Sequence, residues 1–293
     1  MSWWVVVNPS SGSKGEVAER ARKALVGAAV EYEMRVSASG ADILSLVTEG
    51  RAAGATRFAA VGGDGTANLV LNAMMAEPWD VKPVLAILPA GSGSDFIRTF
   101  ALPRTIEQAV LHLATDDVYP CDVGLVEGAF GSRYFLNAAN VGVTAASVVV
   151  GRKLPRRMGG LRYTAGFWMA LGRFGGRPIE LVAGSRRFVG PALAIVVANG
   201  QFFGGGLNVA PRATVMDGVF DVQVFSGPRR QAFTVMPRVI TGSHLTHKAV
   251  RRFVTASIDL ICDDDWPVEA DGEVLGSGPI RAVVVPGAID FKI

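Results

Sequence analysis

Glycine-rich turns and carboxylates recur along this chain of 293 residues, and the central turn is Gly62-Gly63-Asp64-Gly65-Thr66. It follows an apolar run at 58–61 and precedes a helix-like segment at 67–75. Glycine permits a positive φ and a close approach of the backbone to a ligand, and a helix start offers free N–H groups to an anion. These features predict a phosphate site, with an ordinary glycine-rich turn as the alternative. Asp64 does not fit a simple phosphate site, because a carboxylate repels phosphate unless a metal ion or a substrate hydroxyl lies beside it.

Two further loops share this composition. Asn8 to Gly15 follows a predicted strand at 3–7, and Gly91 to Asp95 follows one at 84–88. Ligands of open parallel sheets bind beyond the carboxyl ends of the strands, and Gly, Ser and Asn supply donors for phosphate oxygens. The three loops together favour a nucleotide. None of them matches the phosphate-loop or the dinucleotide-loop pattern.

Carboxylates beside glycine turns are candidates for catalysis. Transfer of a phosphoryl group to an alcohol requires positioning, Mg²⁺ across the phosphates and a carboxylate that takes the hydroxyl proton. A plain β-turn is the alternative for any single Asp-Gly pair. The candidates are Asp64, Asp95, Asp122, Asp217, and Asp271 with Glu273.

The predicted elements indicate two domains. Strands alternate with helices up to about residue 120, which is typical of a parallel sheet covered on both faces. Short β-rich runs separated by Gly, Pro and Asp turns follow, with helical insertions near 160–174 and 228–250, and these indicate a β-sandwich. We therefore expect a three-layer α/β nucleotide-binding domain at 1–122 and a β-sandwich domain at 123–293, whose last strand could return to the first domain.

Composition narrows the class of protein. Hydrophobic residues make up 49% and charged residues 19% of the chain, which argues against disorder. The net charge of +3 is too small to indicate nucleic-acid binding. Two cysteines, Cys121 and Cys262, fit a reducing compartment. No apolar run is long enough to span a membrane and no secretory signal is visible, so we expect a cytoplasmic protein.

In their order, these motifs resemble the diacylglycerol kinase catalytic family, which includes sphingosine and ceramide kinases. The resemblance extends nearly from end to end, although the Gly-Gly-Asp-Gly element alone also occurs in NAD kinases and phosphofructokinases. The fold that it implies is NAD kinase/diacylglycerol kinase-like. The matching segments are Val7 to Gly12, Gly62 to Thr66 with Asn68, Pro89 to Phe96 with Arg98, Asn199-Gly200 with Gly204 to Gly206, Ala210-Pro211 with Ala213, Asp217-Gly218, and Ala270 to Glu273.

The resemblance assigns roles to individual residues. Glu273 would accept the hydroxyl proton with Asp271 beside it, and Asp64 would help to position catalytic Mg²⁺. The implied ATP-binding residues are Asn8, Pro9, Ser10, Ser11, Gly12, Ser37, Gly62, Gly63, Asp64, Gly65, Thr66, Asn68, Gly91, Ser92 and Asp95. The implied metal ligands are Asp64 and Asp122, and, for a second, structural Mg²⁺, the Asp217 carboxylate with the carbonyls of Thr214 and Val219.

The resemblance implies an ATP- and Mg²⁺-dependent lipid kinase of phospholipid biosynthesis, with diacylglycerol as the expected acceptor and phosphatidic acid as the product. The third loop departs from many bacterial diacylglycerol kinases, which have Gly-Thr-x-Asn-Asp where this chain has Gly-Ser-Gly-Ser-Asp at 91–95. This difference is closer to sphingosine kinases and leaves the lipid open. The alternatives are a sphingoid-base or other lipid kinase, an NAD kinase, and a non-catalytic lipid- or nucleotide-binding protein.

The expected partners are a lipid substrate and a membrane surface, with a second copy of the chain as an open alternative and no nucleic acid. The basic segment 151–158 precedes an aromatic stretch at 163–174. It is either a solvated loop or a surface for anionic headgroups, with Phe167, Trp168 or Met169 entering the interface. In the second case the protein is peripherally membrane-associated when active.

Overall fold

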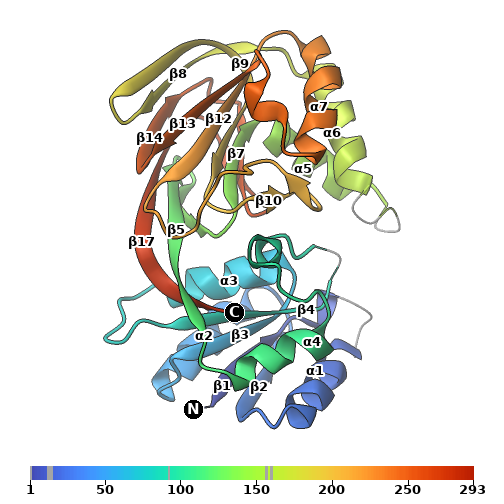
Figure 1. Ribbon diagram of the computed structural model, residues 1–293, viewed down its shortest axis with the longest axis vertical. Helices are drawn as coiled ribbons and strands as arrows, with labels where there is room; N and C mark the ends of the chain where they lie inside the picture. Colours follow the sequence, from blue (N-terminus) through green and yellow to red (C-terminus); the bar gives the residue numbers. More distant parts are fainter. Residues whose placement is uncertain (1, 12–15, 92, 156–157, 159–160) are drawn as a thin grey trace. The chain divides into compact units, whose positions relative to one another are not determined.

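The computed structural model (Figure 1) describes residues 2–11, 16–91, 93–155, 158 and 161–293. The chain divides into two compact units. The first unit comprises Met1–Cys121 and Gly287–Ile293, and the second comprises Asp122–Pro286. The chain passes between them twice, along β5 (Val118–Gly128) and along β17 (Ile280–Lys292).

A parallel sheet forms the centre of the first unit. Its strands lie in the order β2 (Tyr32–Val36), β1 (Trp3–Val7), β3 (Arg57–Gly62) and β4 (Val84–Pro89). The end of β17 extends the sheet, since Asp290 and Phe291 pair in parallel with Val84 and Leu85. Parallel strands buried on both faces are apolar along their whole length, as β1 and β4 are.

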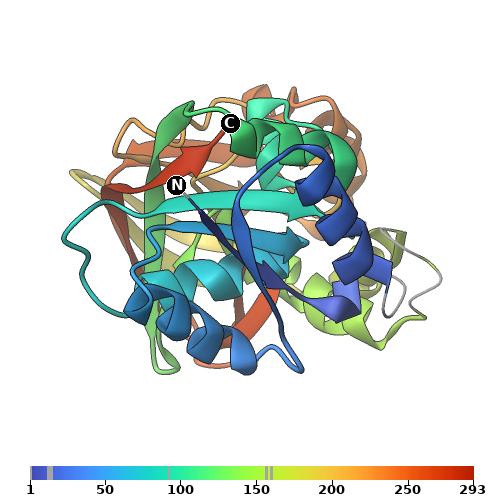
Figure 2. The same ribbon diagram turned by 90° about the horizontal axis from the view of Figure 1, so that it is seen from below.

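Helices cover both faces of this sheet (Figure 2). One face carries α1 (Glu16–Gly27), α4 (Ile106–Ala109) and the 3-10 helix η3 (Val110–Ala114), and the other carries α2 (Asp42–Ala52) and α3 (Asp64–Met74). Two adjacent tryptophans of β1 divide between the layers. Trp3 Nε1 donates to Leu113 O at 3.1 Å and Trp4 Nε1 to Leu46 O at 2.9 Å, so each buried indole has a partner. The predicted three-layer α/β arrangement is confirmed.

The second unit is built from antiparallel strands in two layers that share β9 (Arg186–Ala198). The second half of β9 pairs with β7 and β12, whereas its first half pairs with β8. One layer contains β13 (Val250–Thr255), β12 (Phe220–Ser226), β7 (Ala138–Gly142), β15 (Pro267–Ala270) and β16 (Glu273–Ser277). The other contains β8 (Arg177–Ala183), β14 (Ser257–Ile261), β17, β5 and β6 (Gly131–Phe135). A separate short pair joins β10 (Phe202–Phe203) to β11 (Leu207–Asn208).

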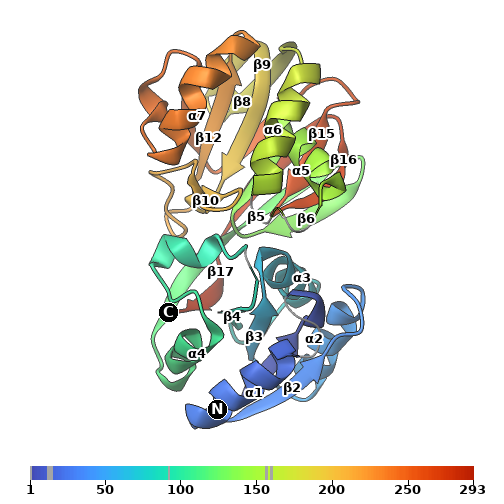
Figure 3. The ribbon, with the colours of Figure 1, turned by 90° about the vertical axis from the view of Figure 1, so that its right-hand side faces the viewer.

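Apolar side chains fill the space between these layers. Ile195, Val222 and Leu181 belong to this cluster with fully buried Trp266, and the predicted sandwich is confirmed. Three helices lie on an outer face of the unit (Figure 3). They are α5 (Val143–Lys153), α6 (Leu161–Arg173) and α7 (Ala232–Ile240), and the 3-10 helices η5 (Arg229–Gln231) and η6 (His244–Thr246) flank α7.

Local structure departs from the simple sequence pattern in a few places. The β-rich run at 133–138 contains parts of two strands, β6 and β7, and the segment after Asp95 forms the 3-10 helix η2 (Phe96–Phe100). Helix α5 was not predicted, because its run of valines at 148–150 is typical of a strand. Across the described part of the chain, no helix combines the length and hydropathy needed to cross a bilayer.

Candidate active site

The loop after β1 is tied to the start of α3 by Asn8. Its Nδ2 donates to Thr66 Oγ1 at 3.0 Å, and its Oδ1 accepts a hydrogen bond from Ser10 N at 3.0 Å. Ser11 Oγ lies 3.4 Å from the same Thr66 hydroxyl. Pro9–Ser11 form the 3-10 helix η1, whereas Gly12 lies outside the described residues. The first two predicted phosphate loops therefore contact each other.

The glycines of the central turn serve close packing. A Cβ on Gly62 would lie 2.3 Å from Thr66 Oγ1, and one on Gly63 would lie 2.4 Å from Gly93 O. Neither of these glycines has a positive φ, and nor does Gly65. The expectation of left-handed backbone was therefore wrong for this turn, although the expectation of close backbone approach was right.

Asp64 joins the central turn to the third loop. Its Oδ2 accepts a hydrogen bond from Asp95 N at 2.7 Å, and its Oδ1 accepts one from Phe96 N at 3.1 Å. Its own N–H donates to Gly93 O at 3.0 Å. The carboxylate that looked misplaced among phosphate loops thus binds the start of η2. Asp95 is itself buried and pairs with Arg98 at 3.1 Å.

The remaining predicted nucleotide residues of this unit differ in exposure. Gly91 is exposed, and a Cβ there would lie 3.0 Å from Ser11 O, so the third loop also approaches the first. Ser37 is buried and its hydroxyl donates to Val7 O at 3.1 Å. Asn68 is fully buried in α3. Ser92 lies outside the described residues.

The carboxyl edge of the first sheet is therefore a set of interlocked loops. The hydroxyls of Ser11 and Thr66 meet there beside the amino end of α3, and the backbone N–H of Ser10 lies in the same loop. A helix amino terminus and adjacent loop donors suit an anion such as a polyphosphate. Sequence reasoning located these loops, but it did not show that Asn8 and Asp64 hold them together.

In the second unit, Asp271 connects the turn before β16 to the start of β7. Its carboxylate accepts hydrogen bonds from the N–H groups of Leu136 at 2.7 Å, Asn137 at 2.9 Å and Ala138 at 3.2 Å. Its φ of 48° lies in the left-handed region, which a non-glycine residue adopts only when its surroundings hold it there. Asp271 is therefore a fixed part of this turn.

Glu273 is the more accessible carboxylate of the same turn. It is half-exposed, and its Oε2 lies 2.7 Å from Arg152 Nη2 at the end of α5. The same Nη2 donates to Gly272 O at 2.8 Å. Arg133 of β6 interacts electrostatically with the carboxylates of this turn. Burial lowers the pKa of its guanidinium, while the negative charges of Glu273 and Asp271 oppose that shift.

Glu269 is a buried carboxyl group that sequence reasoning missed. It precedes the turn in β15, and only 4% of it is exposed. Gly272 N donates to its Oε2 at 2.8 Å, and Asn140 Nδ2 donates to its Oε1. Burial raises its pKa to about 8, and the nearby charge of Asp271 adds to that rise. The only signal in the sequence was a glutamate at the centre of an otherwise apolar strand.

The predicted structural metal site gathers around a turn that Asp122 holds. Asp122 is buried, and its Oδ2 accepts a hydrogen bond from Gly218 N at 2.7 Å. Asp217 and Thr214 are exposed, and Asp217 Oδ1 accepts from Val219 N at 3.2 Å. An exposed carboxylate beside main-chain carbonyls has the chemistry that a hard cation requires. Within the described ranges, no group of three or more His, Cys, Asp or Glu side chains could hold a metal ion.

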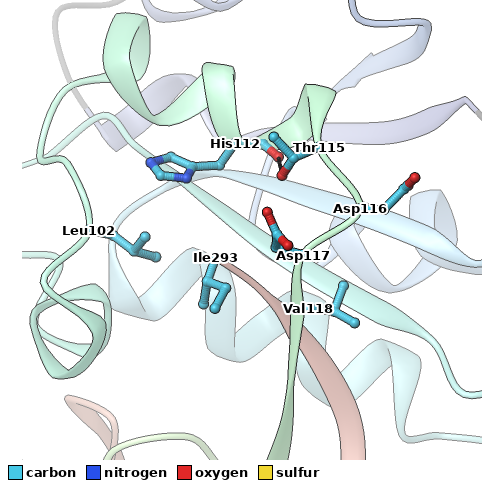
Figure 4. Close-up of a pocket in the computed structure, with 7 residues that line it drawn as sticks. All are labelled: Leu102, His112, Thr115, Asp116, Asp117, Val118 and Ile293. Carbon is cyan, nitrogen blue, oxygen red and sulfur yellow. Dashed lines mark hydrogen bonds between the residues drawn. The ribbon is translucent and has the colours of Figure 1, made fainter.

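Figure 4 shows a surface depression of the first unit that lies apart from the predicted residues. His112, Thr115 and Asp117 line it together with Ile293. Lys292 Nζ donates to Thr115 Oγ1 at 2.9 Å and also to Asp117 O, which fixes the carboxyl end of the chain. None of the predicted site residues lines this depression.

Comparison with protein families matches both halves of the chain. The diacylglycerol kinase catalytic domain matches residues 2–126, and the YegS C-terminal NAD kinase beta sandwich-like domain matches residues 137–292. Among curated proteins, the probable lipid kinase YegS-like protein of Shewanella frigidimarina is 30% identical, over 89% of this chain and 84% of that protein. The Cronobacter sakazakii protein of the same description is 27% identical, over 89% of this chain and 86% of that protein.

Comparison with solved structures extends this similarity to the fold. A diacylglycerol kinase from Bacillus anthracis matches with a TM-score of 0.73 and 20% identity. The match covers 99% of this chain and 96% of that structure. Both units of the chain therefore have counterparts within a single known fold.

Proposed function

The chain belongs to the diacylglycerol kinase family and is similar to lipid kinases along most of its length, and on that premise we propose that it transfers the γ-phosphate of ATP to the hydroxyl of diacylglycerol. The product is phosphatidic acid. The observation that carries the proposal is the interlocked set of loops at the carboxyl edge of the first sheet, joined by Asn8 and Asp64. The choice of diacylglycerol draws on the solved relative named for that activity. A sphingoid base is the second candidate because of the Gly-Ser-Gly-Ser-Asp sequence at 91–95.

ATP binds at the carboxyl edge in this proposal. The loop Asn8 to Gly12 and the turn Gly62 to Asn68 contact the phosphates, with Ser37, Gly91, Ser92 and Asp95 around them. The close approach of Gly62 and Gly63 to neighbouring atoms supports this role, since side chains there would displace Thr66 or Gly93. When bound, Mg²⁺ would offset the charge of the phosphates, and Asp64 would help to position it.

Glu273 is the proposed base, and Asp271 is a positioning residue. The three N–H groups that bind the Asp271 carboxylate support this division, because they hold its oxygens in the turn. Glu273 is half-exposed, and an exposed Arg152 is its ionic partner. A carboxylate within reach of an incoming hydroxyl can accept its proton as the phosphoryl group is transferred.

We assign a structural Mg²⁺ to the second unit, at Asp217 with the carbonyls of Thr214 and Val219. The exposed Asp217 carboxylate supports this assignment. Asp122 would support this site indirectly, since its carboxylate accepts a hydrogen bond from Gly218 N and so fixes the turn that contains Asp217. Loss of thermal stability on chelation, abolished in Asp217→Ala, would support the site, whereas equal melting with and without chelator would remove it.

The kinase acts at a membrane in this proposal, through a surface formed by α6 and α7. The rings of Trp168 and Phe233 stack across these helices with centroids 4.8 Å apart. Phe233 is 67% exposed and Ile240 is 64% exposed, and Met169 is also exposed. Exposed apolar side chains on helices next to basic residues are typical of an interfacial surface.

Charge on this surface favours anionic lipid. Residues 128–179 and 222–258 contain no Asp or Glu, and they include α5, α6 and α7. Exposed arginines of these helices and of the turn before α7 are Arg152, Arg173, Arg229, Arg230 and Arg238. Basic residues near an anionic bilayer contribute about 1 kcal/mol each. Two of the basic residues predicted for this role, Arg156 and Arg157, lie outside the described residues.

The surface can be tested with sedimentation on vesicles of phosphatidylglycerol and phosphatidylcholine. The double variant Phe233→Ser with Ile240→Ser should bind these vesicles at least about tenfold more weakly, since two large apolar side chains leave the interface. The control is Val26→Ser with Leu111→Ser, which replaces apolar residues of similar exposure in the first unit. Equal binding by both double variants would contradict the assignment.

The proposed reaction is tested by radiolabelled ATP offered with a panel of lipids and with NAD. Phosphorylation of diacylglycerol, lost in Glu273→Ala, is the expected result. Labelling of a sphingoid base would move the substrate to the second candidate. Labelling of NAD alone would replace the lipid kinase proposal, and transfer to no acceptor would indicate a binding protein of the same fold.

A further inference from the structure

We propose that Glu269 is a positioning residue for phosphoryl transfer, which holds the Asp271–Glu273 turn in the conformation that presents Glu273. The inference rests on the proposed role of Glu273 as the base. Glu269 is a feature of the strand before the turn and has no assigned role in the reaction described above.

The geometry places Glu269 beneath the turn. Val268 and Ala270 of β15 belong to the core between the sandwich layers, so the intervening Glu269 points to the opposite face. Helix α5 packs on that face against β7, β15 and β16. The Glu269 carboxyl group therefore lies in a closed space, where its Oε2 binds the N–H of Gly272.

The Gly272 contact links Glu269 to Glu273. Gly272 has a positive φ of 82°, and both of its backbone polar groups have partners: its N–H donates to Glu269, and its carbonyl accepts from Arg152. Asp271 is held in turn by the N–H groups at the start of β7. Glu273 follows directly, so the direction of its side chain depends on these contacts.

Glu269 fits this place as a neutral carboxyl group. A buried acid favours its uncharged form, and burial raises the pKa of Glu269 to about 8. Its neighbour Asn140 has a buried Oδ1 without a hydrogen-bond partner. Asn140 Nδ2 donates to Glu269 Oε1, which suits a carboxylate oxygen. For the neutral acid, rotation of the Asn140 amide would exchange Nδ2 with Oδ1, and Oδ1 would then accept the carboxyl proton.

Burial is the main reason that Glu269 resists ionisation, and the groups around it act in both directions on its pKa. Asp271 raises its pKa, whereas Arg152 of α5 and the donors Gly272 N and Asn140 lower it. Glu273 is paired with Arg152, and Arg133 of β6 lies near Asp271 and Glu273. Ionisation above about pH 8 would place a second negative charge beside Asp271 and loosen the turn. The folded state then holds a proton that the unfolded chain releases near its ordinary pKa of 4.5, so stability falls as the pH rises from about 4.5 to 8.

The test compares the wild-type protein with Glu269→Gln and Glu269→Ala. Glutamine keeps the shape and hydrogen bonds of the neutral acid but does not titrate. We expect Glu269→Ala to lower kcat at pH 7 by about tenfold or more, since a misplaced base reduces the rate steeply, and we expect Glu269→Gln to rescue most of that loss. The wild-type kcat should decline above about pH 8, and the decline should disappear in Glu269→Gln.

Thermal unfolding without substrate supplies the second measurement. Between pH 5 and 9, the Tm of the wild-type protein should fall relative to that of Glu269→Gln. The control is Asp221→Asn, which changes a buried carboxylate of the same unit that pairs with Arg252 and should leave the pH profile of kcat unchanged. Parallel Tm profiles for wild type and Glu269→Gln, or a wild-type decline in kcat that persists in Glu269→Gln, would overturn the inference. Failure of the wild-type protein to phosphorylate any lipid would instead refute the proposed function, and the Tm comparison would still report on Glu269.

Discussion

In the loops of the first unit and in the turn of the second unit, an aspartate carboxylate accepts hydrogen bonds from backbone N–H groups. The two sites differ in the side chains that surround this aspartate. Asp64 accepts hydrogen bonds from the N–H groups of Asp95 and Phe96, and Asp271 accepts them from three residues at the start of β7. Each aspartate precedes a glycine in the sequence. In both units an Asp-Gly pair therefore fastens the turn to a segment distant in sequence.

The two sites differ in the chemical groups that surround the Asp64 and Asp271 carboxylates. Around Asp64 the neighbours are hydroxyls and a helix amino terminus, which suit an anion. Around Asp271 the neighbours are two glutamates, the buried Glu269 and the half-exposed Glu273. The first arrangement is suited to binding and the second to proton transfer. In the proposed mechanism the base is therefore Glu273 and neither aspartate, because both aspartates are engaged by backbone N–H groups.

The largest expected effect is the loss of catalytic rate caused by the substitution Glu273→Gln. Removal of a general base lowers kcat by about 10² to 10⁴, while the fold should persist because Glu273 is half-exposed and paired only at the surface. Steady-state kinetics and circular dichroism check both parts. Glu127→Gln, which changes an exposed glutamate of β5, is the control. A Glu273→Gln enzyme with near-normal kcat would end the distinction between the two units.

Asp271→Ala should act mainly on stability. It leaves three N–H groups without their acceptor, and unpaired buried groups cost about 1–3 kcal/mol each, so we expect the free energy of unfolding to fall by about 3 kcal/mol or more. Urea unfolding measures the change. Asp259→Ala is the control, because Asp259 is an exposed carboxylate on β14 of the same unit. Equal unfolding curves for the two variants would show that the hydrogen bonds of Asp271 do not stabilise the fold.

Much of the fold was predictable because its signals are local. The buried strands of the first unit are continuous apolar runs, and the turns after them contain the glycines and serines that mark a sheet edge. Helix α5 was missed since its valines favour a strand and only packing against β7 and β15 makes it helical. Local sequence predicts elements well where burial and propensity agree.

The partners of the site residues were not predictable in the same way. The partners of Asp271 lie more than 130 residues earlier in the chain, and those of Asp64 lie in the next loop but one. Which carboxylates would be bound by N–H groups depends on the tertiary fold. Glu269 was missed for a related reason, because a glutamate within a short strand is ordinarily exposed, and only α5 above it makes it buried.

Asp64→Ala should have a smaller effect on stability than Asp271→Ala, since two N–H groups lose their acceptor and not three. We expect a loss of about 2 kcal/mol in the free energy of unfolding, together with weaker ATP binding as the third loop separates from the central turn. Urea unfolding and calorimetric titration with ATP measure these effects. Asp80→Ala changes an exposed aspartate of the same unit and serves as the control. Unchanged stability with lost activity would instead indicate a role confined to chemistry.

The smallest effect is expected for Arg152→Ala, which breaks the ion pair with Glu273 at the end of α5. Both side chains are more than 40% exposed, and pairs of this kind contribute about 0–1 kcal/mol. The free energy of unfolding should therefore change by less than about 1 kcal/mol, and high salt should reduce the difference further. Arg187→Ala, which breaks the surface pair of Arg187 with the partly exposed Glu180 at 2.8 Å, is the control. A loss well above that of the control would mean that the hydrogen bond from Arg152 to Gly272 O stabilises the turn more than the ion pair does, and that Glu273 is less free than its exposure indicates.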